Sequence, residues 1–198
     1  MRDKYFADKR DLVKWGMLLL LADMNHAHSI LQMAYYRPES GRSPEIDLGG
    51  ELHALPNAVL DQFRKLQSVT AIRSSADVFV MMDEWNDRDA YHKEVLRRIH
   101  ALPSPSVVFL DPDTGLEPNG TAGPKHVREE ELRRVWRALR PHDLLVFYQH
   151  QPNRNGQPWI DEKRTQFENA LGVEPGTAKV AQGREIAHDV AFFYLAAT

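Results

Sequence analysis

Short apolar runs alternate with segments of helical spacing along most of this chain, and this pattern constrains the fold more than any other feature. Four of the runs are almost wholly apolar: residues 29–36 (SILQMAYY), 78–82 (VFVMM), 107–110 (VVFL) and 143–148 (DLLVFY). A strand with one face in water alternates apolar and polar residues, whereas a strand covered on both faces is apolar throughout. The pattern therefore predicts an α/β fold in three layers, with a mainly parallel sheet between helices.

The segments beside these runs complete the predicted topology. Helical spacing of apolar residues predicts helices over residues 9–24, with Asp8 as the N-cap, and over 57–66, 87–102, 127–139 and 159–171. The last two runs, 178–182 and 189–196, are too close together for a crossover helix, so we expect them to pair antiparallel. We therefore expect one domain, 1–198, with a doubly wound sheet that ends in an antiparallel hairpin.

Composition narrows the class of protein. With 42% hydrophobic and 27% charged residues, the chain is typical of a folded globular protein. The absence of cysteine excludes disulfides and thiolate catalysis and suits a reducing cytoplasm. The longest apolar run, Met17–Ala22, is too short to cross a bilayer, and a formal net charge of -3 gives no global attraction to nucleic acid. We expect a cytoplasmic protein that does not enter a membrane.

The third apolar run leads directly into the acidic turn DPDTGLE, which carries Asp111, Asp113 and Glu117. Ligands of open parallel sheets bind outside the carboxyl ends of the strands, so these carboxylates are candidates for a working site. The alternative is an ordinary polar turn, in which proline sets one dihedral angle and glycine adopts an unusual one. The turn interpretation is favoured for Thr114 and Gly115, whereas both remain open for Asp111.

Two further segments supply polar candidates. Tyr148 ends the fourth apolar run, and His150 lies two residues beyond it. A histidine side chain can donate or accept a hydrogen bond, which suits acid–base chemistry, although a histidine in a polar loop is also common on surfaces. Lys125 precedes a predicted helix, where backbone amides and a lysine hold phosphates in other proteins. Arg154, beside an Asn-Gly turn, is a candidate anion contact.

Several motifs carry a resemblance to known proteins. KYFADKRDLVKW, FLDPDTGLEP, GPKHV and FYQHQP resemble those of an uncharacterised bacterial family of stand-alone domains. Asp11 and Lys14 before an apolar helix, with Asp111-Pro112 at a strand end, are similar to the bacterial 23S ribosomal RNA adenine-N6 methyltransferases, which are class I and Rossmann-like. The resemblance implies S-adenosylmethionine as cofactor, a nucleic acid or nucleotide as partner, and Asp111 as the group that takes up the target amino group.

The chain also departs from the methyltransferase pattern. Trp15 replaces a histidine, and Asp113-Thr114 replaces the Pro-Tyr pair whose aromatic ring stacks on a flipped base. The first apolar run is followed by RPESG rather than by the glycine-rich loop that cradles S-adenosylmethionine.

Three hypotheses follow. The first is a methyltransferase-like enzyme that acts on a nucleic acid or nucleotide. Its catalytic residues are Asp111, Asp113, Lys14 and His150, and its substrate-binding residues are Tyr5, Asp11, Lys125, Tyr148 and Arg154. The second is a metal-dependent nuclease or phosphohydrolase that holds Mg²⁺ through Asp111, Asp113 and Glu117, although no standard metal motif is present. The third is a non-catalytic nucleotide- or protein-binding module with a degenerate cofactor site.

Overall fold

The computed structural model of the chain describes residues 8–37, 45–54, 56, 58–59, 66–118, 123–152 and 158–198. Two of the proposed site residues, Tyr5 and Arg154, lie outside these ranges. Most of the helix predicted over 57–66 does as well.

A six-stranded sheet forms the centre of the protein, in the order β4-β1-β5-β8-β10-β9. The strands are β1 (Ser29–Met33), β4 (Asp77–Met81), β5 (Ser106–Leu110), β8 (Leu144–His150), β9 (Lys179–Gly183) and β10 (Ala187–Ala196). The first four run parallel, and β10 pairs antiparallel with both β8 and β9. The predicted α/β class, the mainly parallel sheet and the antiparallel hairpin at its end are confirmed.

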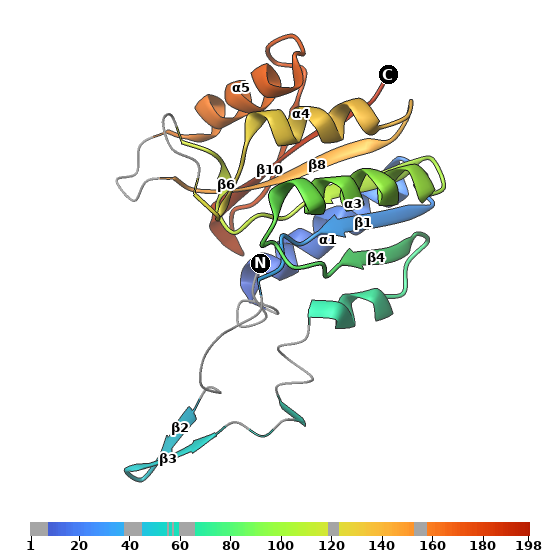
Figure 1. The fold of residues 1–198 in the computed structure, drawn as a ribbon. Coiled ribbons are helices and arrows are strands. Elements are labelled where there is room, and N and C mark those ends of the chain that lie inside the picture. The colour runs from blue at the N-terminus through green and yellow to red at the C-terminus, as the bar shows by residue number, and fades with distance from the viewer. Residues whose placement is uncertain are drawn as a thin grey trace.

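Helices cover both faces of the sheet (Figure 1). They are α1 (Lys9–Met24), α3 (Arg88–Ala101), α4 (Glu129–Ala138) and α5 (Ile160–Leu171), with a 3-10 helix η2 (Leu66–Ala71). α1 lies behind the sheet in the view of Figure 1, whereas α3, α4 and α5 lie in front of it. Two small pairs complete the described elements: β2 (Glu45–Leu48) with β3 (Glu51–Ala54), and β6 (Gly115–Leu116) with β7 (His126–Val127).

Each face of the sheet packs its own hydrophobic cluster, which explains the continuous apolar runs. Successive side chains of a strand point to opposite faces. In β5, Val107 and Phe109 pack with α1, whereas Val108 and Leu110 pack with α3, α4 and α5. All four side chains are fully buried. The sheet is therefore the middle layer of three, as the absence of polar alternation predicts.

Local sequence signals set the ends of two helices. The side chain of Asp8 accepts hydrogen bonds from the backbone amides of Arg10 and Asp11, so it caps α1 as predicted. At the start of α4, Glu131 accepts a hydrogen bond of 2.8 Å from the amide of Arg128. This second cap begins α4 at Glu129, two residues later than predicted, because His126 and Val127 pair with β6 instead.

The order of the strands places a crevice at one end of the sheet. The chain passes from β1 to β4 on one side, and then returns past β1 to β5 on the other. The connection from β1 and the connection from β5 therefore lead to opposite sides of the sheet. The place between these two strands is the switch point, where open α/β sheets bind ligands. Asp111 follows β5 at this point, and its amide donates a hydrogen bond of 3.0 Å to the carbonyl of Met33 at the end of β1.

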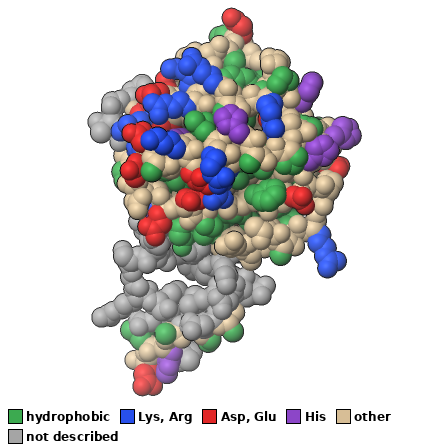
Figure 2. Space-filling model, turned by 45° about the vertical axis from the view of Figure 1, so that its right-hand side comes forward, with side chains coloured by type: hydrophobic (Ala, Val, Ile, Leu, Met, Phe, Trp, Pro, Cys, Tyr) green, Lys and Arg blue, Asp and Glu red, His purple; other side chains and the backbone are tan. Residues whose placement is uncertain are grey.

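The distribution of charge on the surface and the length of the helices are consistent with two expectations from the sequence: a near-balanced net charge and no helix that crosses a membrane. On the face that Figure 2 shows, basic side chains lie among acidic ones. Among the described residues, no helix is long and apolar enough to cross a membrane.

The turn after Asp111 depends on a glycine. Gly115 has a φ of +126°, and a Cβ atom there would overlap the side-chain amide of Gln149. That amide accepts a hydrogen bond of 2.9 Å from the amide of Leu116 and donates one of 3.2 Å to the carbonyl of Thr114. Gly115→Ala should therefore lower the free energy of unfolding by at least about 2 kcal/mol in denaturant titrations, because it adds backbone strain and displaces Gln149.

Gly123→Ala is the matched control. A Cβ atom at Gly123 would lie 3.6 Å from Nδ1 of His126, which is an ordinary contact. We expect it to change the free energy of unfolding by less than about 0.5 kcal/mol. Equal stability of the two variants would contradict this account of the turn.

Candidate functional site

A pocket of about 270 Å³ opens over the carboxyl ends of β5 and β8, beside the first turns of α1. It is lined by Asp8, Arg10, Asp11, Lys14, Asp111, Pro112, Asp113, Thr114, Lys125, Tyr148 and His150. The pocket thus brings together every proposed catalytic and substrate-binding residue that the structure describes. Asp8 and Arg10 were not singled out from the sequence as site residues.

A buried ammonium group joins α1 to the end of β5. Nζ of Lys14 lies 2.7 Å from Oδ1 of Asp11 and 2.9 Å from Oδ2 of Asp111. All three residues are at least nine-tenths buried. Burial by itself lowers the pKa of Lys14, but the charges of Asp111 and Asp11 outweigh it and raise this pKa well above its usual value. Lys14 is therefore charged at neutral pH.

One oxygen atom of Asp111 is held from two sides. Oδ2 accepts hydrogen bonds from Nζ of Lys14, at 2.9 Å, and from Nε2 of Gln32 in β1, at 2.7 Å. Within the described part of the chain, every hydrogen bond recorded for this carboxylate goes to Oδ2. Asp111 also lines the pocket. Oδ1 therefore remains as a fixed acceptor for a ligand.

Gln32 is a site residue that the sequence analysis missed. It is a fully buried polar residue in β1, which is otherwise almost wholly apolar. A polar side chain inside such a run needs a hydrogen-bond partner. The polar Gln32 within SILQMAYY therefore indicated that a hydrogen-bond partner was needed. The sequence did not identify Asp111 as that partner, because Asp111 lies far along the chain.

Tyr148 forms an aromatic wall of the pocket. Nζ of Lys14 lies 5.4 Å from the centre of its ring, and its far side packs edge-on against Phe192 at 5.7 Å. Burial raises the pKa of Tyr148, and the nearby Lys14 offsets only part of this increase. The Tyr148 hydroxyl is therefore protonated at neutral pH and can donate a hydrogen bond.

A second charged group lies at the rim. The guanidinium of Arg10 contacts Asp189 in β10 and lies 3.0 Å from Oδ2 of Asp8. Nε2 of His150 lies 3.4 Å from Oδ2 of Asp189. Burial raises the pKa of Asp189, but the hydrogen bond with Arg10, together with the charges of Arg10 and His150, outweighs this effect, so the net shift is downward. The rim therefore pairs both Arg10 and His150 with the same carboxylate.

Lys125 differs from the other cationic residues of the pocket. Lys14, Arg10 and His150 each have a carboxylate within ion-pair distance, whereas no such partner is found for Lys125 among the described residues. The side chain of Lys125 is exposed at the pocket. It is thus available to an anionic group of a ligand.

The segment Gly123–Val127, which we call the strap, carries Lys125, and its carbonyl groups are held by neighbouring side chains. Nη2 of Arg88 in α3 donates hydrogen bonds to the carbonyls of Gly123 and His126, at 3.0 and 3.2 Å. Nε1 of Trp85 donates to the carbonyl of Pro124 at 3.0 Å. The carbonyl of Lys125 itself accepts a hydrogen bond of 2.7 Å from Oγ1 of Thr114. The strap is therefore fixed at four consecutive residues.

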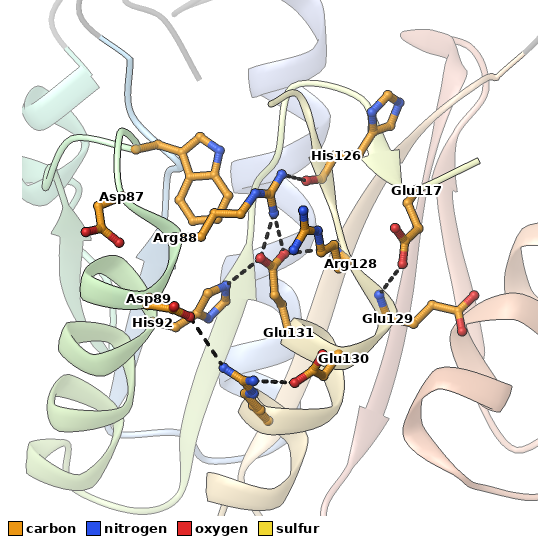
Figure 3. Close-up of polar contacts among 12 residues, drawn as sticks. Asp87, Arg88, Asp89, His92, Glu117, His126, Arg128, Glu129, Glu130 and Glu131 are labelled. Atoms are coloured by element: carbon orange, nitrogen blue, oxygen red, sulfur yellow. Dashed lines mark hydrogen bonds and ion pairs between the residues drawn. The ribbon is translucent and has the colours of Figure 1, made fainter. Parts of the chain in front are cut away.

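Glu131 fixes Arg88 in turn. Nη1 of Arg88 lies 2.6 and 2.8 Å from the two carboxylate oxygens of Glu131 in α4, and its guanidinium stacks 4.7 Å from the ring of Trp85. Nε2 of His92 lies 3.6 Å from Oε1 of Glu131 (Figure 3). Burial raises the pKa of Glu131, but the nearby His92 and the hydrogen bonds from Arg88 and the Arg128 amide outweigh it and lower this pKa to about 2.

Of the three carboxylates proposed as Mg²⁺ ligands, Asp111 and Asp113 line the pocket, whereas Glu117 is directed away from it. Asp113 forms an ion pair with Arg37. Oε1 of Glu117 accepts a hydrogen bond of 3.0 Å from the amide of Glu129 at the start of α4, and Glu117 does not line the pocket. The turn at Gly115 causes this separation, because it directs the chain into β6. In the described ranges, no group of three or more His, Asp or Glu residues is placed to hold a metal ion.

The place that the methyltransferase resemblance implies for S-adenosylmethionine is filled by aromatic rings. Tyr35 follows β1, and its ring centre lies 4.8 Å from that of Trp85 and 5.2 Å from that of Tyr91. The amide of Tyr35 donates a hydrogen bond of 3.0 Å to the hydroxyl of Tyr91. All three side chains are buried.

The backbone closes the same crevice. Tyr36 forms a parallel bridge with Glu84, and the amide of Trp85 donates a hydrogen bond of 2.7 Å to the carbonyl of Tyr36. The chains that leave β1 and β4 therefore remain paired beyond the ends of these strands. These residues do not fit S-adenosylmethionine in that place.

Lys14→Met should destabilise the protein strongly. It keeps the length of the side chain but leaves Asp11 and Asp111 buried without a counter-charge. We expect a loss of about 3–5 kcal/mol in the free energy of unfolding, measured with urea. The control is Lys93→Met on the exposed side of α3, which should change stability by less than about 0.5 kcal/mol. Similar losses in both variants would refute a structural role for the buried ammonium group.

Glu131→Gln should flatten the acid dependence of stability. The pKa of Glu131 is lowered from 4.5 to about 2 in the folded protein, so its contribution to stability is present above pH 4.5 and is lost as the pH falls toward 2. Between these values the wild-type unfolding free energy should fall more steeply than that of the variant. In an Arg88→Met background the difference should shrink, because a hydrogen bond that lowers this pKa is gone. Parallel curves for wild type and Glu131→Gln would contradict the assignment.

Known proteins provide no independent guide to this site. Comparison with family models, with curated proteins and with solved structures found no match to this chain. The chemistry of the pocket therefore has to be argued from its own geometry.

Proposed function

We propose that the pocket binds a nucleotide, or a base of a nucleic acid, and that Asp111 accepts a hydrogen bond from the amino group of that base. One observation carries the proposal: Oδ2 of Asp111 is held by Lys14 and Gln32, while Oδ1 is left for the pocket. The carboxylate lies at the switch point of the sheet, where open α/β folds bind their ligands.

The chemistry of the pocket favours a base with an amino group. A carboxylate accepts hydrogen bonds and donates none when it is ionised. The exocyclic amino group of adenine, cytosine or guanine donates, whereas a carbonyl at the same position only accepts. A site that is built to accept from an N–H group rejects the analogue that lacks it, because the buried acceptor is then left unpaired.

Two other residues suit the rest of a nucleotide. Tyr148 offers an aromatic wall and a hydroxyl donor, and bases pack readily against aromatic side chains. Lys125 offers a positive charge that no described carboxylate neutralises. It lies at the rim, where the phosphate group of a bound nucleotide would extend out of the pocket. The strap holds this lysine, so the phosphate site is organised before the ligand binds.

The resemblance to the adenine-N6 methyltransferases supports the same ligand class. The proposed partner of Asp111 is an amino group in both cases, and the sheet that ends in an antiparallel hairpin is what that resemblance implies. The chain differs from what the resemblance implies at the aromatic rings after β1, because these rings occupy the place that the resemblance implies for the cofactor. We therefore propose a nucleotide-binding protein of methyltransferase descent with a degenerate cofactor site, and we derive no methyl transfer.

Calorimetry with AMP, IMP and S-adenosylmethionine tests the proposal. AMP and IMP differ in the group at position 6 of the purine, which is an amino group in AMP and a carbonyl in IMP. AMP should bind at least about tenfold more tightly than IMP, which corresponds to about 1.4 kcal/mol. S-adenosylmethionine should not bind.

Asp111→Asn should reverse this preference. If the amide oxygen replaces Oδ2 between Lys14 and Gln32, the amide nitrogen takes the position of Oδ1 and presents N–H groups to the pocket. The variant should then bind IMP more tightly than AMP. Glu117→Gln is the control, since Glu117 lies in the same loop outside the pocket and should leave the preference unchanged.

Two results would overturn the proposal. Equal affinity of the wild type for AMP and IMP would refute recognition of the amino group by Asp111. Binding of S-adenosylmethionine, with transfer of a labelled methyl group to AMP or RNA, would restore the methyltransferase hypothesis and refute the degenerate site.

A further inference from the structure

The outer face of α1 is apolar although it faces solvent. Leu12 and Leu20 are each 66% exposed, and Met24 is 74% exposed. Gly16 lies between the two leucines, and a Cβ atom added there would have no neighbour within 4 Å. A surface helix of a globular protein normally presents polar residues on the side away from the core. Packing in the core therefore does not explain why these residues are apolar.

Charged residues lie at both ends of this face. Lys9 and Asp23 are exposed, and in the part of the chain that the structure describes neither side chain has an ion-pair partner. Lys9 precedes Gly16 by seven residues and Asp23 follows it by seven; Leu12 and Leu20 are each four residues away. With 3.6 residues per turn, these residues lie within an arc of about 80° that is centred on Gly16.

This arrangement is complementary to itself. If two copies of α1 pack antiparallel about a two-fold axis at Gly16, Lys9 of one copy faces Asp23 of the other, and Leu12 faces Leu20. The same two contacts then occur twice, as in every interface with two-fold symmetry. Gly16 has no side chain, so the two helices can approach closely where they cross.

We propose that the outer face of α1, defined by Lys9, Leu12, Gly16, Leu20 and Asp23, docks a second copy of this chain in an antiparallel arrangement. Charge complementarity selects a second copy as the occupant, since one face supplies both the cation and the anion. The turn between β9 and β10 lies beside α1, because it begins at Gly183, which packs closely against Val13, and it carries a further exposed apolar residue, Ile186, which is 43% exposed.

The proposed interface is separate from the nucleotide pocket. Lys14 and Asp11 are buried on the opposite side of α1, where they meet the sheet. Substitutions on the outer face therefore leave the ion group with Asp111 intact. Because the two sites lie on opposite sides of α1, an experiment on the dimer and an experiment on nucleotide binding can fail independently of each other.

Solution mass over a concentration series tests the proposal, by sedimentation velocity and light scattering of the full chain. The wild type should form a dimer, and Leu20→Glu should weaken it at least tenfold, because two buried glutamates would then lie at the symmetric contact. Phe79→Glu is the matched control: Phe79 is 44% exposed on β4, away from α1, and this variant should dimerise like the wild type. Circular dichroism and thermal melting of each variant verify that it is folded.

Charge reversal tests the antiparallel register. Lys9→Asp should weaken the dimer by placing like charges opposite each other, and adding Asp23→Lys should restore it. The chain has no cysteine, so Gly16→Cys introduces a single thiol at the proposed axis. With oxidised glutathione as the electron acceptor, Gly16→Cys should form a disulfide-linked dimer rapidly, whereas Phe79→Cys should not.

Three outcomes would overturn the proposal: a wild type that is monomeric at every concentration, a folded Leu20→Glu variant that dimerises like the wild type, or a double charge reversal that does not recover the affinity lost in Lys9→Asp. The first excludes a dimer, the second places it elsewhere, and the third excludes this register.

Discussion

The ion group of Lys14, Asp11 and Asp111 connects the fold of this protein to its site. Burying an isolated ammonium group costs a large desolvation free energy, so Lys14 needs both carboxylates, one from its own helix and one from the end of β5. Because Gln32 of β1 also binds Asp111, the group joins α1 to two neighbouring strands at the switch point. The same contacts that hold the helix on the sheet thereby fix the orientation of the Asp111 carboxylate.

The pocket is assembled from both faces of the sheet. α1 supplies the buried ions on one side, whereas α3 and α4 act from the other side through Arg88 and Glu131, which never reach the pocket. Arg88 holds the carbonyls of the strap, and the strap carries Lys125 to the rim. Lys125, which has no carboxylate partner among the described residues, thus lies on a segment that a half-buried ion pair holds, and this pair has its own, separate acid dependence. The carbonyls of Pro124 and Lys125 are held independently of that pair, by Trp85 and Thr114.

Fold and chemistry separate in this protein, as they do wherever one architecture carries several functions. The sheet is mainly parallel and ends in an antiparallel hairpin, and Tyr35, Trp85 and Tyr91 pack against one another beyond the ends of β1 and β4. The rings close the side of the switch point near β4, while the side near β8 stays open as the pocket. The proposed recognition of a base, without its modification, rests on this closed side and on the open pocket beside Asp111.

The sequence by itself determined the strands of the central sheet, the helices α1, α3, α4 and α5 and the layers that they form, because the spacing of apolar residues, the Asp8 cap and the short link before β10 are local signals that each act within a few residues. It also placed Asp111 at a strand end. It did not indicate the small pairs β2–β3 and β6–β7. Only the tertiary structure decided which side chains meet: Lys14 with Asp111, which are 97 residues apart, and Gln32 with the same carboxylate. It likewise turned Glu117 away to the start of α4. Such pairings depend on strand order and on the direction of each side chain, and neither property is written in any short stretch of the chain.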